Sequence, residues 1–361
     1  MRGISRILKV TTALVTAAAL LVVCPGIWQD LRAVTKKAAV LSAGLRQPRE
    51  AAAALSERLR AGSPAPRTTT FSTASTSTTA SAPVTLLTNA PAPPRSQKGG
   101  TVVEQALPAG KIAVGHVAWQ NRSGTDVDVV GQFGKTPAIR LTGTDAPQVL
   151  IVHTHTTESY MDYYSGYYND SDVTRTKDAA HSVVAVGEEI AARLRDAGIG
   201  VIHDRTVHDS PQYTGAYDRA AQTIQKNLKA YPTIQVVLDI HRDAIMPDDT
   251  TKIKPTVTVD GRKAAQVMII AGVVDDPDAS HPHWRDNLRL ALALQEGLAT
   301  RYPGLARPLS AVASRYNEHL TRGSLLIEIG TDANTVAEAV YSGGLVGQTL
   351  AAVLADYKQG G

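Results

Sequence analysis

The segments Val-Leu-Ile-Val-His-Thr-His-Thr-Thr-Glu (residues 149–158) and Val-Val-Leu-Asp-Ile-His-Arg-Asp (residues 236–243) decide the fold of this chain. Each is a short apolar run of the kind that forms a buried strand, and each leads into histidine. A third run, Leu-Leu-Ile-Glu-Ile-Gly (residues 325–330), holds a carboxylate. Such runs alternate with helical patterns of about 15 residues. This alternation predicts one α/β domain, with a mostly parallel or mixed sheet covered by helices on both faces.

The polar residues of these runs are His153, His155, Glu158, His241 and Glu328. Because the carboxyl ends of parallel strands open on one crevice, we expect these side chains to lie close together. A mononuclear zinc hydrolase needs three protein ligands, an open position for water and a separate carboxylate that moves the proton. The alternative is structural, since a single histidine at a strand end is more often a satisfied core residue than a ligand. The residue types leave both interpretations open.

The N-terminus carries a targeting segment. Three basic residues precede an apolar run over residues 10–28, close to the roughly 20 residues that span a bilayer. We therefore expect residues 1–29 to be an uncleaved, single-pass membrane anchor with the catalytic domain outside the cytoplasm. Cys24 is the only cysteine, which excludes a disulfide framework and thiol chemistry. Val23 stands where a lipoprotein signal needs a small residue, so we do not expect lipidation.

Composition divides the rest of the chain. Residues 30–61 predict a juxtamembrane helical segment, and residues 62–99, rich in Ser, Thr, Pro and Ala, predict a disordered linker. A β-rich lead-in over residues 100–147 precedes the catalytic domain at residues 148–358. The net charge of +4 is mild, and its basic residues form no nucleic-acid-binding signature. Nucleic acid is therefore not an expected partner.

Seven short motifs occur in order along this domain. They are HTHTTESY (153–160), VVAVGEEI (183–190), PQYTGAYDRA (211–220), DIHRDA (239–244), RYPGL (301–305), YN (316–317) and LLIEIGTDANT (325–335). In this order and spacing they resemble the stage II sporulation protein P family. That family comprises cell-wall amidases related to the zinc-dependent N-acetylmuramoyl-L-alanine amidases. The resemblance extends over residues 148–357, and the anchor and linker are similar to the family's layout.

The resemblance implies an amidase-like fold, zinc as cofactor and peptidoglycan as substrate, cut between the muramoyl lactyl group and L-alanine. It places His155 and His241 on zinc and gives Glu328 the role of general base and then acid. An additional endopeptidase activity on stem peptides is also reported in this family. A zinc peptidase or deacetylase of other specificity is the first alternative. A non-catalytic wall-binding protein is the second, although the ligand histidines and Glu328 are all present.

The third zinc ligand departs from the pattern of the related amidases, which have a glutamate at the start of the first long helix. Residues 178–186 offer Asp178 and His181 there but no glutamate. Glu158 is then the best candidate, because it is the only glutamate close behind His155. If Glu158 is not a ligand, His153, Asp178 and His181 are the next candidates.

For His153 and Arg242 the sequence allows two interpretations each. If the strand runs through His153, that residue shares a face with His155 by the period of two, as a supporting residue or an oxyanion donor. Arg242 either binds a substrate carboxylate or the scissile carbonyl, as a catalytic residue, or forms an ion pair with Asp239 or Asp243. The resemblance further implies action on septal wall during engulfment in sporulation. The partners that it implies are the stage II sporulation proteins D and M, with contacts in residues 30–61.

Overall fold

The computed structural model describes residues 94–96, 98–142, 146–274 and 281–358. The chain divides into two units, Met1–Glu50 and Ala51–Gly361, and all described residues belong to the second. The predicted anchor, the juxtamembrane segment and nearly all of the linker lie outside the described residues. Within the described part of the chain, no helix is long and apolar enough to cross a bilayer.

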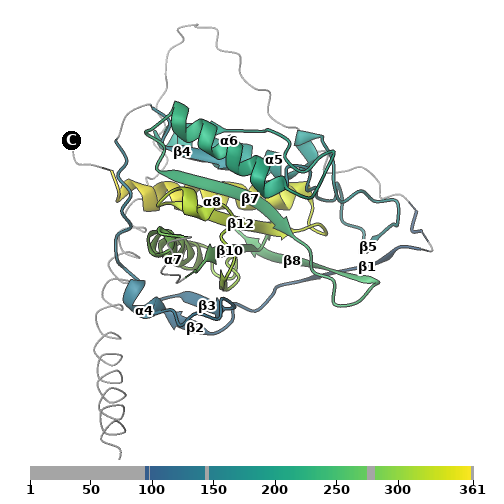
Figure 1. Cartoon of the computed structure of the whole chain (residues 1–361). Coiled ribbons are helices and arrows are strands. Elements are labelled where there is room, and N and C mark those ends of the chain that lie inside the picture. Colours follow the sequence, from purple (N-terminus) through teal and green to yellow (C-terminus); the bar gives the residue numbers. More distant parts are fainter. Residues whose placement is uncertain (1–93, 97, 143–145, 275–280, 359–361) are drawn as a thin grey trace, which may run out of the picture. The chain divides into compact units, whose positions relative to one another are not determined.

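Twelve strands and five α-helices form the described unit (Figure 1). The strands are β1 (Gly100–Gln105), β2 (Ile112–Val114), β3 (Val117–Asn121), β4 (Val149–Val152), β5 (Tyr167–Tyr168), β6 (Val201–His203), β7 (Val236–Asp243), β8 (Thr251–Val259), β9 (Arg262–Ala265), β10 (Val267–Gly272), β11 (Leu309–Val312) and β12 (Ser324–Thr331). The helices are α4 (Val129–Gln132), α5 (Val183–Asp196), α6 (Ala216–Ala230), α7 (Trp284–Arg301) and α8 (Val336–Ala355), with short 3-10 turns η1 (Ala179–His181) and η2 (Glu318–Leu320).

The main sheet has eight strands in the order β2-β3-β11-β10-β12-β7-β4-β6. Strands β12, β7, β4 and β6 are neighbours in this order and are parallel to one another. Strand β10, on the other side of β12, is antiparallel to it. The sheet is therefore mixed, which confirms the expected mixed α/β fold. A second sheet of four strands, in the order β5-β1-β8-β9, extends beside it (Figure 1).

Helices cover both faces of the main sheet. The larger hydrophobic core joins one face to α5, α7 and α8, and its sheet residues include Ile151, Leu238 and Ile327. The smaller core lies on the other face, where Leu150 and Val237 pack against Ile224 of α6. Alternate residues of one strand thus point to opposite cores, as the period of two requires. Both faces of the central strands are buried, which explains why their sequences read as continuous apolar runs.

Individual residues determine where helix α5 begins and where the β8–β9 hairpin turns. Ser182 caps α5, and its hydroxyl accepts a hydrogen bond from the backbone N–H of Val184. At the tip of the β8–β9 hairpin, Asp260 and Gly261 have φ values of 49° and 75°. Positive φ at both turn positions is the geometry of the two-residue hairpin turn that Asp-Gly favours.

Strands β4, β7 and β12 bring the polar residues to one edge of the sheet. Val152, the last residue of β4, is paired with Asp239 of β7, and Glu328 of β12 is paired with His241. The segment that follows β4 therefore leaves the sheet beside His241 and Glu328. Three parts of the sequence separated by about 85 residues each converge there, as expected for the carboxyl ends of parallel strands.

Candidate metal centre

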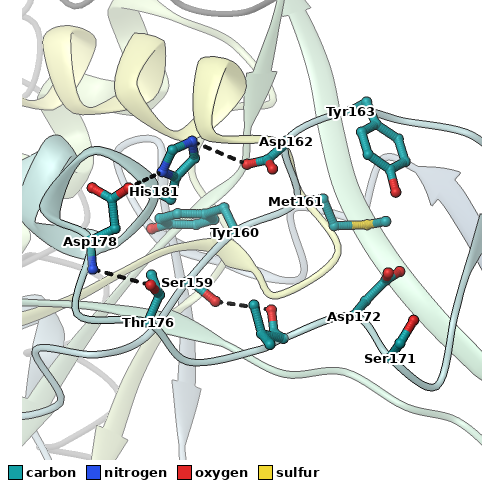
Figure 2. Close-up of a pocket in the computed structure, with 11 residues that line it drawn as sticks. Ser159, Tyr160, Met161, Asp162, Tyr163, Ser171, Asp172, Thr176, Asp178 and His181 are labelled. Carbon is teal, nitrogen blue, oxygen red and sulfur yellow. Dashed lines mark hydrogen bonds and ion pairs between the residues drawn. The ribbon is translucent and has the colours of Figure 1, made fainter. Parts of the chain in front are cut away.

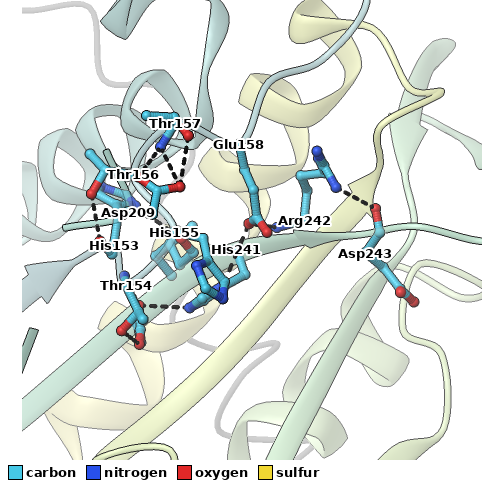
Figure 3. A network of polar contacts seen from close by, with 12 residues as sticks. His153, Thr154, His155, Thr156, Thr157, Glu158, Asp209, His241, Arg242 and Asp243 are labelled. Carbon is cyan, nitrogen blue, oxygen red and sulfur yellow. Dashed lines mark hydrogen bonds and ion pairs between the residues drawn. The ribbon is translucent and has the colours of Figure 1, made fainter. Parts of the chain in front are cut away.

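Three buried side chains form a group that can hold a metal ion. One ligand atom from each of His155, Glu158 and His241 lies within 4.8 Å of the other two (Figure 3). His155 and Glu158 come from the tight turn after β4, in which the N–H of Glu158 donates to the carbonyl of His155 at 3.0 Å. His241 comes from β7. The structure thus brings together the two histidines that the family resemblance assigns to zinc and Glu158, the candidate for the third ligand.

Asp239 sets the orientation of the His241 ring. Its Oδ1 lies 2.8 Å from Nε2 of His241, and Thr154 holds the carboxylate through its backbone N–H at 2.8 Å and its hydroxyl at 2.6 Å. The other ring nitrogen, Nδ1, then faces Oε2 of Glu158 at 3.4 Å. Burial lowers the pKa of His241, but the Asp239 and Glu158 carboxylates outweigh it and raise that pKa well above its usual value. This pocket therefore favours a positive charge. A carboxylate behind a ligand histidine is typical of metal sites.

Tyr213 orients the His155 ring in a similar way. Its hydroxyl lies 3.0 Å from Nε2 of His155, and the two rings stack with centroids 4.5 Å apart. Nδ1 of His155 is buried and has no hydrogen-bond partner among the described residues. Arg175 lies over the Tyr213 ring and 3.7 Å from Glu158. A buried ring nitrogen without a partner, next to a second imidazole and a carboxylate, fits the donor set of zinc.

Glu328 lies next to this group as a separate carboxylate. In the strand register, Glu328 of β12 lies opposite His241 of β7. Its Oε2 is buried without a hydrogen-bond partner among the described residues. Burial raises the pKa of Glu328 to about 8. Burial acts in the same direction on Glu158, but there the hydrogen bond and the charge of His241 prevail and lower the pKa. The pKa of the buried Glu158 is thus lowered, whereas the pKa of the half-buried Glu328 is raised.

His153 lies outside the strand, so the condition under which it would share a face with His155 is not met. The reason is that β4 ends at Val152, so that the residues after it form a turn. His153 is fully buried, with Nδ1 2.9 Å from the carbonyl of Ile240 and Nε2 2.8 Å from Nε2 of His203. Burial, and next the neighbouring His203, lower its pKa to about 3.

Arg242 binds backbone carbonyls near the metal group. Its guanidinium donates to the carbonyl of Ser159 at 3.1 Å and to that of Thr174 at 2.7 Å, and its backbone N–H donates to Glu158 at 3.2 Å. The two acidic residues considered as its ion-pair partners are engaged elsewhere, Asp239 with His241 and Asp243 with Arg307 at 2.9 Å. Arg242 thus ties two loop segments together beside Glu158.

Those two segments border a cavity of about 340 Å³ (Figure 2). Its lining includes Ser159 and Tyr160, which directly follow Glu158 in the chain. Asp178 and His181, considered as alternative metal ligands, lie in this lining and pair with each other at 2.8 Å. They are therefore separate from the group of His155, Glu158 and His241. None of His155, Glu158 and His241 lines the cavity, which borders the chain directly after Glu158.

The sequence interpretation missed several supporting residues. Asp239 carried a usable signal, because it lies two residues before His241 in the same strand and must share its face. Tyr213 lies within a recognised motif, but nothing in its type or spacing indicates contact with His155. Asp209 accepts from Thr157 at 2.7 Å and pairs with Arg175 at 2.7 Å, a long-range network without a local sequence signal.

Comparison with known proteins agrees with the motifs. The family model for stage II sporulation protein P matches residues 95–354, most of the chain. The chain belongs to the stage II sporulation protein P family. It is 30% identical over 215 residues to the stage II sporulation protein P of Bacillus subtilis (strain 168). This alignment covers 56% of the chain and 50% of that relative, so the chain spans about half the length of the curated family member.

Solved structures with some similarity are N-acetylmuramoyl-L-alanine amidases. AmiC2 of Nostoc punctiforme has 13% identity and a TM-score of 0.33, covering 59% of this chain and 97% of its own. The CwlD amidase of Clostridioides difficile, solved with the GerS lipoprotein, has 12% identity and a TM-score of 0.35, covering 58% and 98%. Ami1 of Mycobacterium smegmatis has 14% identity and a TM-score of 0.32, covering 59% and 98%. Similarities this weak add nothing on the chemistry of the site in this family member.

Proposed function

We propose that this member of the stage II sporulation protein P family is a zinc-dependent peptidoglycan hydrolase. Its activity is that of an N-acetylmuramoyl-L-alanine amidase acting on septal wall during engulfment. The observation that supports the proposal most directly is the convergence of His155, Glu158 and His241, with the Glu328 carboxylate beside them. Three ligands and a separate proton carrier are the minimal set for hydrolysis of an amide at a zinc site.

The residues divide the work of amide hydrolysis. Zinc held by His155, Glu158 and His241 would lower the pKa of a water and polarise the amide carbonyl. Glu328 takes the proton of the attacking water on its carboxylate and returns it to the departing nitrogen, which cannot leave as an anion. Its burial raises its pKa toward the range in which one group both accepts and donates a proton. Asp239 keeps the His241 ring in position during this exchange.

The experiment uses the full chain in detergent with intact sacculi, with and without a chelator, and identifies the products by mass spectrometry. We expect release of stem peptides with a free L-alanine amine, loss of activity with chelator, and recovery with added zinc. His241→Ala should be inactive, while the matched control His116→Ala, an exposed histidine outside the metal group and the cavity, should keep its activity.

Other products would favour other functions. New ends within the stem peptide alone would indicate a peptidase, and released acetate would indicate a deacetylase. Binding to sacculi without any product, in the presence of bound zinc, would leave a wall-binding protein and contradict the proposal.

The proposal includes a location. The apolar run at residues 10–28 would anchor the chain in the cytoplasmic membrane, with the linker at residues 62–99 carrying the catalytic domain to the wall outside. Stage II sporulation proteins D and M are the proposed partners, through residues 30–61. In spheroplasts, external protease should then degrade the catalytic domain of a membrane-bound chain. A mature protein that begins after residue 28, or that carries a lipid at Cys24, would contradict the anchor.

A further inference from the structure

A second cluster of histidines and a carboxylate lies outside the metal group described above. It consists of His281 and His283, just before α7, and Glu318 and His319 in η2. His281 and Glu318 are each only 1% exposed. Among the described residues, neither ring nitrogen of His281 has a hydrogen-bond partner, and neither do Oε1 of Glu318, Nδ1 of His283 or Nδ1 of His319. So many buried polar atoms without partners in one place need an explanation.

The geometry resembles a slightly widened metal site. Nε2 of His281 lies 3.8 Å from Oε2 of Glu318, and the rings of His281 and His319 are 6.4 Å apart at an angle of 82°. In the first metal group, the rings of His155 and His241 are 5.3 Å apart at 88°. Two ligand atoms on a tetrahedral zinc are roughly 3.3 Å apart, given bonds near 2.0 Å. The His281–Glu318 pair is therefore close to that spacing. The His319 ring lies farther from His281 than the His155 and His241 rings lie from each other, so His319 has to move closer when the ion binds.

The charges of the cluster suit a cation ligand set better than an ion pair. Burial, and then the neighbouring His319 and His283, lower the pKa of His281 to about 4, so that its ring is neutral. Burial raises the pKa of Glu318 well above its usual value. A neutral histidine is the form that binds metal, and a bound cation would return Glu318 to its charged form. Glu318 is already oriented, because the N–H of Gly272 donates to its Oε2 at 2.7 Å.

We propose that His281, Glu318 and His319 bind a second zinc ion, with His283 as the fourth ligand. This ion joins the start of α7 to η2. The residue before η2, Asn317, donates from its amide to the carbonyl of Tyr217 at 2.8 Å. The Tyr217 ring packs 5.5 Å from that of His155. A second zinc therefore has a structural role, holding a wall of the first metal group in place.

Metal content of the full chain, after equilibration with zinc and removal of free metal, tests this proposal. We expect two zinc ions per wild-type chain. His241→Ala should lose one, His281→Ala or Glu318→Gln should lose the other, and the double variant His241→Ala/Glu318→Gln should hold none. The matched control is His116→Ala, because His116 is exposed and lies in neither cluster. Circular-dichroism melts would identify any variant that fails to fold, and His319→Asn then takes its place.

A second measurement separates this site from the first. Cobalt(II) bound to His241→Ala should still give the visible absorption of a tetrahedral ion, and Glu318→Gln in that background should remove it. One zinc in the wild type and none in His241→Ala would overturn the second site. Absence of peptidoglycan hydrolysis with two zinc ions bound would count against the proposed function alone. The two proposals can therefore fail independently.

Discussion

Glu158 and Glu328 show how the same residue type receives two roles at one site. Both carboxylates lie next to His241, yet their pKa values move in opposite directions from the usual value. Burial raises both, but Glu158 gains the hydrogen bond and the charge of His241, which prevail and keep it ionised. Glu328 lacks a hydrogen-bond partner at Oε2 among the described residues, and its pKa rises to about 8. An ionised glutamate suits a metal ligand, and one titrating near neutrality suits proton transfer.

The first prediction concerns Glu328→Gln, which keeps the side-chain size and removes the basic carboxylate. Zinc content and melting temperature should match the wild type, while hydrolysis falls roughly 100-fold or more, as for loss of a general acid–base group. Metal analysis, thermal melts and single-turnover cleavage on one preparation would check this.

The contrary explanation is that Glu328 is a structural carboxylate paired with Arg242 or Arg322. Arg242 instead donates to the carbonyls of Ser159 and Thr174, and Arg322 pairs with Asp286 at 2.9 Å. A stable Gln variant with nearly normal turnover would remove Glu328 from the mechanism.

The second prediction concerns Tyr213→Phe. The substitution keeps the ring that stacks on His155 but removes the hydroxyl at 3.0 Å from Nε2. Without that contact the ring loses its preferred tautomer and orientation, so zinc affinity should fall by roughly 10-fold, as for other groups behind metal ligands. Competition with a chromophoric chelator measures this directly. Tyr231→Phe, on an exposed tyrosine at the end of α6, is the matched control, and equal affinities in both variants would exclude the role.

The members of the candidate metal group were visible in the sequence at the residue scale, whereas the residues that contact them were not. His155 and His241 stand at the ends of apolar runs, and a histidine in that position is visible in the sequence. Tyr213 reaches His155 from a distant loop, a contact that depends on tertiary folding. His153 would share a face with His155 only if the strand ran through it, and β4 ends one residue earlier, at Val152.

At the scale of elements, the local sequence pattern predicted the helices and the central strands. It did not predict which strands lie next to each other in the sheets. The hairpin of β8 and β9 was visible in Asp260 and Gly261. The next strand, β10, leaves that hairpin for the main sheet, where it lies between β11 and β12. Nothing in its apolar sequence specifies this, because strand pairing depends on which faces the whole fold buries.

The third prediction concerns the buried contact between His153 and β6, where His203 lies. Burial holds the pKa of His153 near 3, so the folded protein keeps the ring neutral. The unfolded chain protonates it below about pH 6.5 and therefore binds more protons as the pH falls. Stability should decline from about pH 6.5 downward, with a contribution from His153 of about 2 kcal/mol at about pH 5.

Urea unfolding of the metal-free protein, in chelator at about pH 7.5 and about pH 5, checks this prediction. In His153→Gln, whose side chain does not titrate, the loss of stability between the two pH values should be smaller. An equal loss of stability in both proteins would mean that His153 does not contribute to the pH dependence, and would contradict the prediction.

At the scale of the whole molecule, the segment predicted as a β-rich lead-in is built into both sheets. Strand β1 pairs in parallel with β8, and β3 pairs in parallel with β11. Leu141 donates its N–H to the carbonyl of Tyr357 at 3.0 Å, close to the end of α8. The composition of residues 100–147 predicted strands there, but these long-range pairings carry no compositional signal.

The last prediction follows from this pairing and compares two truncated chains with the full one. A chain that begins at residue 94 should keep the melting temperature of the full protein's catalytic unit. A chain that begins at residue 148 should lose most of its stability, although it retains every proposed ligand. It lacks the fully buried Val117, Ile139 and Leu141, each worth about 1.5–3 kcal/mol when buried, and it uncovers the edge of β11.

The loss of these residues is comparable to the whole stability of a typical domain, about 5–15 kcal/mol. Thermal melts and limited proteolysis of the three chains, each measured with its zinc content, would check the comparison. Because residues 94–147 contribute no proposed metal ligand, any loss of zinc in the shorter chain must arise through unfolding. Equal melting temperatures and equal zinc content in the chains that begin at residues 94 and 148 would show that the lead-in is an accessory segment.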